Sequence, residues 1–508
     1  MSAPTGKRSG SGRPTRARGL MIQGTGSNVG KSSLVAGLAR AYTRRGLRVL
    51  PFKPQNMSNN AAVTFDGGEI GRAQALQAFA CRALPETDMN PVLLKPTAET
   101  GAQIILQGKI WRQMSARDYQ HVKRDLLGPV MESYNRLAEK CDLILVEGAG
   151  AASEVNLRAH DIANMGFARA ADLPVILAGD IDRGGVIANL VGTKIVMAPD
   201  DAAQICGFIV NKMRGDTSLF AAGMATISHH TGWDGLGIVP YFPDLRRLPA
   251  EDSLSLESIS HRAGVADIIV LILPHIANFD DLDPLLDEPD LDIRLVRVDG
   301  STQIAPHVPR SHLIILPGSK SVIQDLTTLK RAGWDEIIRR HVAAGGHVWG
   351  LCGGYQMLGR TICDPDHVES PVAEASGIGL LDVDTVIRRE KSLIAVQGDI
   401  LDGKGRKSGV FEGYEIHCGT TSPTGRHKKL IAAPASSASS AQTDDGRVFG
   451  TYVHGLFDTH VARQSLLARI GRAATQPDKS VVMDDILDRF ADHLEAHLNL
   501  DDLLRRAR

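Results

Sequence analysis

The sequence lacks paired cysteines, long apolar runs and an excess of charge of either sign. None of the six cysteines forms a CxxC pair, which argues against a structural zinc site or a disulfide framework and fits a reducing cytoplasm. No apolar run approaches the roughly 20 residues that a membrane helix needs. The net charge of −1 gives no support for binding to nucleic acid or to an anionic membrane surface. A chain of 508 residues with 43% hydrophobic side chains is expected to be globular and cytoplasmic, with two or three domains.

Short apolar runs alternate with helix-like stretches in two parts of the chain. Residues 1–18 are basic and rich in Gly, Ser and Pro, without the apolar stretch of a secretory signal, and predict a disordered tail. The first alternation covers residues 19–250 and is followed by a Pro- and charge-rich linker at 251–265. The second alternation covers residues 266–475, and helical spacing predicts closing helices at 476–508. Buried strands that alternate with helices form parallel sheets covered on both faces. The sequence therefore predicts an α/β protein with two doubly wound domains.

A glycine-rich stretch, GTGSNVGKSS at 24–33, follows the first apolar run and opens a helix-like segment. In a P-loop, backbone N–H groups cradle phosphates, a lysine reaches the outer phosphates and a serine binds Mg²⁺. The strict pattern has glycine where this chain has Thr25, because the glycine here comes one residue earlier. The alternative is a glycine-rich turn followed by Lys-Ser by chance. The residues expected to bind nucleotide are Gly24, Thr25, Gly26, Asn28, Gly30, Lys31 and Ser32.

Polar residues follow other strands of the same predicted sheet. Glu147 ends the run LILVE, where its carboxylate would join Ser32 as a Mg²⁺ ligand, and Asp66 is a further candidate ligand. Lys53 ends the second run and would contact a carboxylate or a transferring phosphate. Asn211 follows a late strand, at a position suited to recognising a nucleotide base. Solvent-exposed side chains are the alternative for Glu147 and Lys53, and a role outside the site is equally expected for Asp66.

A second reactive centre is indicated by GHVWGLCGGYQMLG, in which Cys352 stands between an apolar strand and a helix. A helix N-terminus favours the thiolate form of a cysteine, and flanking glycines permit close approach of a substrate. The backbone of Gly353, with that of Gly318 or Ser319, would supply an oxyanion hole. His454, at the end of a late strand, is the expected base of a Cys-His pair. The alternatives are a buried structural cysteine and a histidine without a catalytic role.

These motifs resemble known families. The second half, with LCGGYQMLG and YVHGLFD, resembles the class I glutamine amidotransferases, in the subgroup found in cobyrinate and cobyric acid synthases. Most class I members carry Glu two residues after the histidine, whereas this chain has Leu456 and the subgroup lacks that Glu. What would orient His454 is therefore left open. The phosphate loop resembles a longer variant found in dethiobiotin synthetase and its relatives.

The complete set of motifs resembles the cobyric acid synthase family from about residue 19 to at least 470. It includes FKPQNMSNN, GRAQALQA, VEGAGA, GDIDRGG and NKMRGD. A glutaminase releases ammonia, and a carboxylate reacts with ammonia once ATP has converted it to an acyl phosphate. The resemblance implies amidation of the b, d, e and g carboxylates of adenosylcobyrinic acid a,c-diamide. Glutamine, the corrinoid and ATP-Mg²⁺ would then be the ligands, and a homo-oligomer is compatible with the sequence.

Two alternatives stay open at this point. A cobyrinic acid a,c-diamide synthase would use the same chemistry on the a and c carboxylates. A P-loop switch or partitioning ATPase with a degenerate cysteine domain would form no amide product. The presence of both Cys352 and His454 counts against the second alternative.

Overall fold

The computed structural model describes residues 17–98, 101–251, 266–298, 311–402, 404–425, 428–434 and 440–508. Most of the predicted tail and linker, residues 1–16 and 252–265, lies outside these ranges. Ala17 is buried and the first strand begins at Arg18, so the folded chain starts slightly before the predicted boundary at 19. Within the described ranges, every helix is too short or too polar to cross a lipid bilayer.

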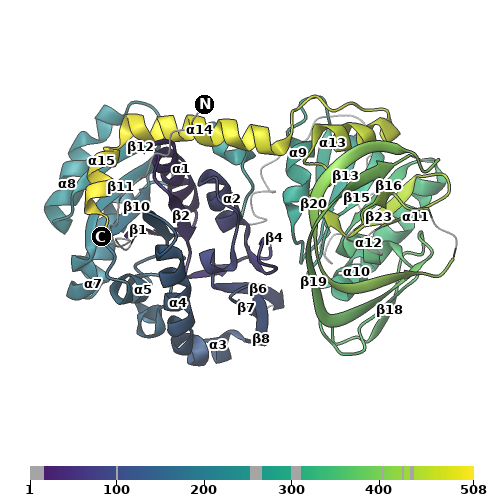
Figure 1. Ribbon diagram of the computed structural model, residues 1–508, viewed down its shortest axis with the longest axis horizontal. Coiled ribbons are helices and arrows are strands. Elements are labelled where there is room, and N and C mark those ends of the chain that lie inside the picture. Colours follow the sequence, from purple (N-terminus) through teal and green to yellow (C-terminus); the bar gives the residue numbers. More distant parts are fainter. Residues whose placement is uncertain are drawn as a thin grey trace, which may run out of the picture.

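A six-stranded parallel sheet organises the first half of the chain (Figure 1). Its order is β12-β11-β10-β1-β9-β2, so the first strand lies at the centre, between β9 and β10. The residues of β1, β9 and β10 are almost all buried, as expected for strands covered on both faces. The doubly wound sheet predicted for this half is confirmed. The strands are β1 (Arg18–Gly24), β2 (Val49–Phe52), β9 (Leu143–Glu147), β10 (Val175–Asp180), β11 (Ile205–Met213) and β12 (Gly235–Pro240).

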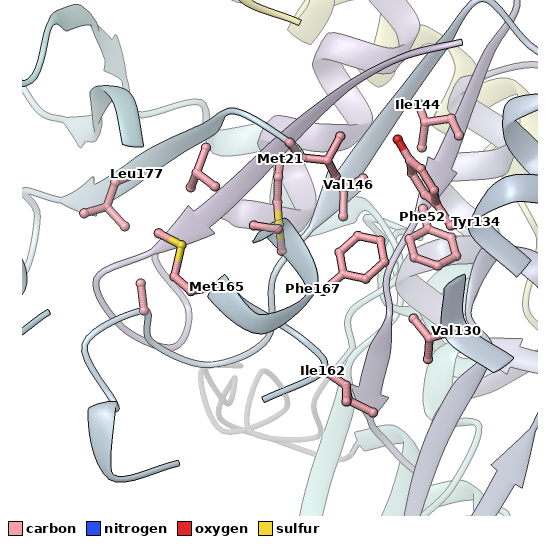
Figure 2. Packing of buried hydrophobic residues seen from close by; sticks show 14 of the residues in the cluster. Met21, Phe52, Val130, Tyr134, Ile144, Val146, Ile162, Met165, Phe167 and Leu177 are labelled. Atoms are coloured by element: carbon pink, nitrogen blue, oxygen red, sulfur yellow. The ribbon is translucent and has the colours of Figure 1, made fainter. Parts of the chain in front are cut away.

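Successive side chains of the central strands enter two separate cores. On one face, Met21 and Val146 lie in a core that contains the rings of Phe52, Tyr134 and Phe167 (Figure 2). These three rings pack against one another with centroids 5.3–5.5 Å apart. The opposite face of β1 packs beneath α1. The principal helices of this half are α1 (Lys31–Arg44), α2 (Arg72–Ala80), α4 (Leu127–Ala138), α5 (Met165–Ala170), α6 (Val186–Val196) and α8 (Ala221–Thr231).

An insertion after β2 forms a small sheet that the sequence analysis did not predict. Its order is β3-β6-β7-β8, and a separate hairpin joins β4 to β5. Leu93 and Ile105 of this insertion form a buried cluster with Ile416 from the second half of the chain. The insertion therefore connects the two halves. Its strands are β3 (Gln55–Met57), β4 (Ala61–Val63), β5 (Glu69–Gly71), β6 (Val92–Ala98), β7 (Gly101–Leu106) and β8 (Lys109–Ser115).

The second half contains another six-stranded sheet, of order β14-β13-β15-β16-β23-β22, in which β22 alone is antiparallel to its neighbour. Its strands are β13 (Ala266–Ile272), β14 (Ile293–Arg297), β15 (Ser311–Leu316), β16 (His347–Leu351), β22 (Ser440–Gln442) and β23 (Val448–Thr451). Helices α10 (Val322–Arg331), α11 (Trp334–Ala343) and α12 (Gly353–Leu358) belong to this half, as does α13 (His460–Leu467). The second α/β architecture is confirmed.

The remaining strands of this half form a further sheet around one long hairpin. The hairpin consists of β19 (Val383–Leu401) and β20 (Lys407–Pro423), and the sheet order is β18-β17-β19-β20-β24. The short members are β17 (Thr361–Cys363), β18 (Glu374–Ser376) and β24 (Val453–His454). The last strand pairs with β20, so His454 lies opposite Tyr414.

The C-terminal helices return to the first half. Helix α14 (Lys479–His497) runs from the second half across the top of the first half in Figure 1, and α15 (Leu500–Arg506) follows it. The apolar face of α14, including Ile486, Phe490 and Leu494, lies in the same core as α1. A Cβ on Gly37 of α1 would come within 2.6 Å of Leu494, so this glycine permits the close approach of the two helices.

Candidate active sites

The predicted phosphate loop joins β1 to α1 in the geometry of a P-loop. Asn28 and Gly30 have positive φ angles of 59° and 97°, and Lys31 is the first residue of α1. A Cβ at Gly24 would lie 2.7 Å from Val29, whereas the backbone N–H of Thr25 donates to Ala178. This packing explains why glycine is needed at position 24, whereas Thr25 does not have the positive φ that would favour glycine.

Lys31 is held at the centre of the loop. Its ammonium group donates to the carbonyl oxygens of Gly26 at 3.0 Å and of Gly150 at 2.8 Å. Burial lowers the pKa of Lys31, and Glu147 partly offsets that effect. A phosphate placed within the loop would give this ammonium group an anionic partner.

Ser32, Glu147 and Lys53 meet beside the loop. The Ser32 hydroxyl donates to Glu147 Oε1 at 2.7 Å, and Lys53 Nζ lies 3.0 Å from the same oxygen and 3.0 Å from Glu251. Burial would raise the pKa of Glu147, but Lys53 and the hydrogen bond from Ser32 hold that pKa below its usual value. A hydroxyl and an ionised carboxylate beside a phosphate loop fit Mg²⁺. The described residues contain no cluster of three or more His, Cys, Asp or Glu side chains suited to a metal.

Two predicted residues of this site have other surroundings. Asp66 lies in the exposed turn between β4 and β5, where it accepts hydrogen bonds from the N–H and O–H of Thr87 at 3.2 and 2.7 Å. These contacts lie within the turn region, and the role of Asp66 as a Mg²⁺ ligand stays a prediction. Asn211 lies against the phosphate loop and donates to the carbonyl of Val29 at 2.9 Å, so its amide nitrogen supports the loop.

A cavity of about 1360 Å³ opens beside these residues. Its lining includes Lys31, Lys53 and Glu147 from the first half and Asp283, Leu286 and Asp287 from the second. This volume exceeds the upper end of the usual range for small-molecule sites, about 1,000 Å³. The cavity therefore has room for more than a nucleotide, and both halves of the chain contribute to it.

Cys352 occupies a strained turn between β16 and α12, with φ 50° and ψ −107°. A Cβ on Gly353 would lie 2.7 Å from the backbone nitrogen of Ser319, and one on Gly318 would lie 3.7 Å from the His454 ring. The structure thus brings together all five residues predicted for this centre, including both candidate oxyanion segments. Strain at such a turn requires the surrounding structure to hold it.

Asp281 is the residue that orients His454, and sequence reasoning missed it. Its carboxylate accepts a hydrogen bond from His454 Nδ1 at 2.7 Å and another from the N–H of Gly455 at 2.8 Å. Burial would lower the pKa of His454, but Asp281 and a hydrogen bond with Cys352 raise it to about 10. Leu456, at the position of the missing Glu, is an apolar core residue. The signal in the sequence that could have indicated Asp281 is the acidic run NFDDLD, which follows a buried strand.

The motif EGYEIHCG contributes directly to the surroundings of this cluster. The ring of Tyr414 stacks on His454, with centroids 5.1 Å apart and planes at 19°. The carbonyl oxygen of Ile416 lies 3.7 Å from Cys352 Sγ. His417 stacks on Tyr452 and lies 3.4 Å from Glu415. A Cys-His-Asp cluster of this kind is suited to acyl transfer through a thioester.

Both halves of the chain match known protein families. A CobQ/CobB/MinD/ParA nucleotide binding domain matches residues 20–256, and a CobB/CobQ-like glutamine amidotransferase domain matches residues 267–462. A cobyric acid synthase of Methylocella silvestris is 56% identical over 489 residues, 96% of this chain and 100% of that protein. The cobyric acid synthase of Methylorubrum populi is 56% identical over 494 residues, which are 97% of this chain and 99% of that protein. A cobyric acid synthase of Rhodobacter capsulatus is 52% identical over 490 residues, which are 96% of this chain and 99% of that protein. The chain belongs to the cobyric acid synthase family of glutamine-dependent amidoligases.

Proposed function

We propose that this chain amidates the b, d, e and g carboxylates of adenosylcobyrinic acid a,c-diamide, with glutamine as nitrogen source and ATP as activating agent. The observation that carries the proposal is one chain that holds both a P-loop beside a buried carboxylate and a Cys-His-Asp cluster. The similarity to cobyric acid synthases supports the corrinoid substrate.

Glutamine hydrolysis would occur at Cys352. The thiolate attacks the side-chain amide carbon of glutamine, and backbone N–H groups of Gly353 and of the 318–319 segment stabilise the oxyanion. His454 gives its proton to the departing nitrogen, which leaves as ammonia. Water then attacks the thioester, releases glutamate and regenerates the thiol.

Acid activation would occur in the cavity beside the P-loop. Lys31 contacts the outer phosphates of ATP, and Ser32 and Glu147 hold Mg²⁺, which neutralises phosphate charge when bound. A substrate carboxylate oxygen attacks the terminal phosphorus, giving an acyl phosphate and ADP. Lys53 holds the carboxylate or the transferring phosphate. Ammonia from the second site then attacks the acyl carbon and displaces phosphate, which leaves an amide.

The test is mass spectrometry of adenosylcobyrinic acid a,c-diamide incubated with the protein, glutamine and ATP-Mg²⁺. Stepwise conversion of four acids to amides, ending at the hexa-amide, is the expected result. Amidation of cobyrinic acid at a and c instead would assign the other synthase. Cys352→Ala should lose glutamine-dependent amidation and keep the ammonia-dependent reaction, whereas Lys31→Ala should lose both. A folded Cys352→Ala variant without either activity would refute the two-site scheme.

A further inference from the structure

Helix α2 begins with an arginine that reaches from the nucleotide-binding half into the glutaminase cluster. The guanidinium of Arg72 is buried, and its Nη2 donates to the Tyr414 hydroxyl and to the carbonyl of Ala61 at 2.8 Å. It also lies 3.1 Å from Asp280, and its Cζ lies 5.2 Å from the centroid of the Tyr414 ring. None of these groups is used in the reaction scheme above.

The partners of Arg72 are the immediate neighbours of the groups that hold His454. Tyr414 stacks on the imidazole, and Asp280 precedes Asp281 in the 3-10 turn Phe279–Leu282. A second contact runs in parallel, because the N–H of Ala61 donates to Asn278, whose amide nitrogen lies 3.4 Å from His454 Nε2. The nucleotide-binding half therefore contacts two direct neighbours of the glutaminase histidine, Tyr414 and Asn278.

The same helix contacts the nucleotide site five residues later. Gln77 Nε2 donates to Glu147 Oε2 at 2.6 Å and to the carbonyl of Ser32 at 3.3 Å, and Gln74 lies 3.5 Å from the same carboxylate oxygen. Five residues of helix span only about 7.5 Å. One short rigid element thus has the candidate Mg²⁺ ligand at one end and the glutaminase cluster at the other.

We propose that Arg72 is a positioning residue for glutamine hydrolysis, supplied by the nucleotide-binding half, and that α2 makes its position depend on the state of the nucleotide site. The inference rests on the proposed function, because it takes Cys352 and His454 as the glutaminase centre. Without Arg72, the buried Asp280 loses its nearest cationic partner and keeps Lys479, at 3.6 Å, and His454 as cationic neighbours. Tyr414 loses the donor to its hydroxyl. The buried negative charge of Asp280, which precedes Asp281, would then be less well compensated. We expect this to disturb the position of the His454 ring, which Asp281 holds.

The coupling follows from what binding would change at Glu147. One oxygen of this carboxylate is now shared by Ser32 and Lys53, and the other is bonded to Gln77. A cation and phosphates at Ser32 and Glu147 would replace the hydrogen bond between these two side chains. The position of the carboxylate relative to Gln77 would then change, and with it the hydrogen bond that Gln77 donates. Because Gln77 and Arg72 belong to the same helix, a shift of α2 would also move Arg72. Coupling requires such a difference in contacts between two states.

The positioning role is tested with Arg72→Met in the full-length protein. We expect kcat for glutamine hydrolysis to fall about 10- to 100-fold, as for misplaced catalytic groups, with KM for glutamine within about twofold. Arg72→Lys, which keeps the charge, should recover part of kcat. Ammonia-dependent amidation should persist and shows that the variant is folded. Arg48→Met is the matched control, since it breaks an exposed Arg-Asp pair on the same half.

The outcomes separate this inference from the proposed function. If Cys352→Ala keeps glutaminase activity, the proposed function fails. If Cys352→Ala loses it while Arg72→Met matches Arg48→Met, only the role of Arg72 fails. Should Arg72→Met not fold, Arg72→Lys combined with Tyr414→Phe gives a double-mutant cycle on kcat, in which additive effects would overturn the positioning role.

The coupling is tested with Gln77→Met, a substitution of similar length that removes both hydrogen bonds. Glutaminase kcat is measured with and without a saturating non-hydrolysable ATP analogue and Mg²⁺. The quantity compared is the ratio of kcat with nucleotide to kcat without it. We expect this ratio to differ from one in the wild type, and to lie about 2- to 30-fold closer to one in Gln77→Met. A wild-type ratio of one, or an unchanged ratio in Gln77→Met, would overturn the coupling.

Discussion

At the scale of single residues, the charge on His454 depends on two neighbours, Asp281 first and then Cys352. The imidazole is completely buried, which by itself favours the neutral ring, yet the Asp281 carboxylate, together with Cys352, raises its pKa to about 10. The ring is therefore protonated at neutral pH and can supply the proton that ammonia needs when it leaves.

Replacing Asp281 by Asn should change both the rate and the pH profile of glutamine hydrolysis. The neutral amide removes the attraction that outweighs burial, so the pKa of His454 falls and the alkaline limb of kcat moves to lower pH. We expect a loss of about 100-fold or more at pH 8, in the range of general acid-base catalysis, and a smaller loss at pH 6. Glutamate release measured from pH 6 to 9 tests this. Asp290→Asn, an exposed acid nearby, is the control, and an unshifted profile in Asp281→Asn would contradict the assignment.

The residues that could be predicted are those whose signal is local in the sequence. Lys31, Ser32, Cys352 and Gly353 lie in short glycine-rich motifs, and a strand-to-helix turn imposes that composition. Asp281 was missed because it is 173 residues from His454 and follows a different strand, so the acidic run NFDDLD did not indicate its partner. Asp66 stays a predicted metal ligand, and its bonds to Thr87 show that an acidic residue in a turn can equally serve the turn itself.

At the scale of elements, the sequence predicted helices whose partners it could not identify. Apolar spacing in α14 indicates a buried face, but not that this face packs on α1, more than 400 positions earlier in the chain. The insertion between β2 and α4 was missed because β3, β4 and β5 have only three residues each, and β6 contains Pro96. The central strands were predictable because strands buried on both faces are nearly continuous apolar runs.

Leu494→Ala should show how much the docking of α14 contributes to stability. Leu494 is completely buried against α1 near Gly37, so truncation leaves a cavity between the two helices. We expect the free energy of unfolding to fall by about 2–5 kcal/mol, read from the urea midpoint of the transition. Val481→Ala on the same helix is the control, because Val481 is 56% exposed and its change should stay within about 0.5 kcal/mol. Equal effects of the two variants would show that α14 does not dock as described.

At the scale of the whole molecule, several separate connections hold the two halves together. The insertion packs on Ile416, α14 crosses from the second half to the first, and Arg72 pairs with Asp280. Both halves line the cavity beside the P-loop. Such an arrangement favours transfer of ammonia within one chain, where it is neither diluted nor protonated in bulk water.

Mixing two variants that each lack one site tests transfer within the chain. Cys352→Ala can activate the acid but releases no ammonia, and Lys31→Ala releases ammonia but activates no acid. Transfer inside one chain benefits from an effective concentration in the millimolar range, whereas micromolar enzyme releases ammonia into solution at far lower initial concentration. We therefore expect the mixture to show less than about a tenth of the wild-type initial rate of glutamine-dependent amidation. Added ammonium should restore the rate of Cys352→Ala in the same mixture, which shows that its amidation site is intact. A mixture that reaches half the wild-type rate without ammonium would mean that ammonia travels through solution, and that the contacts between the halves serve stability rather than transfer.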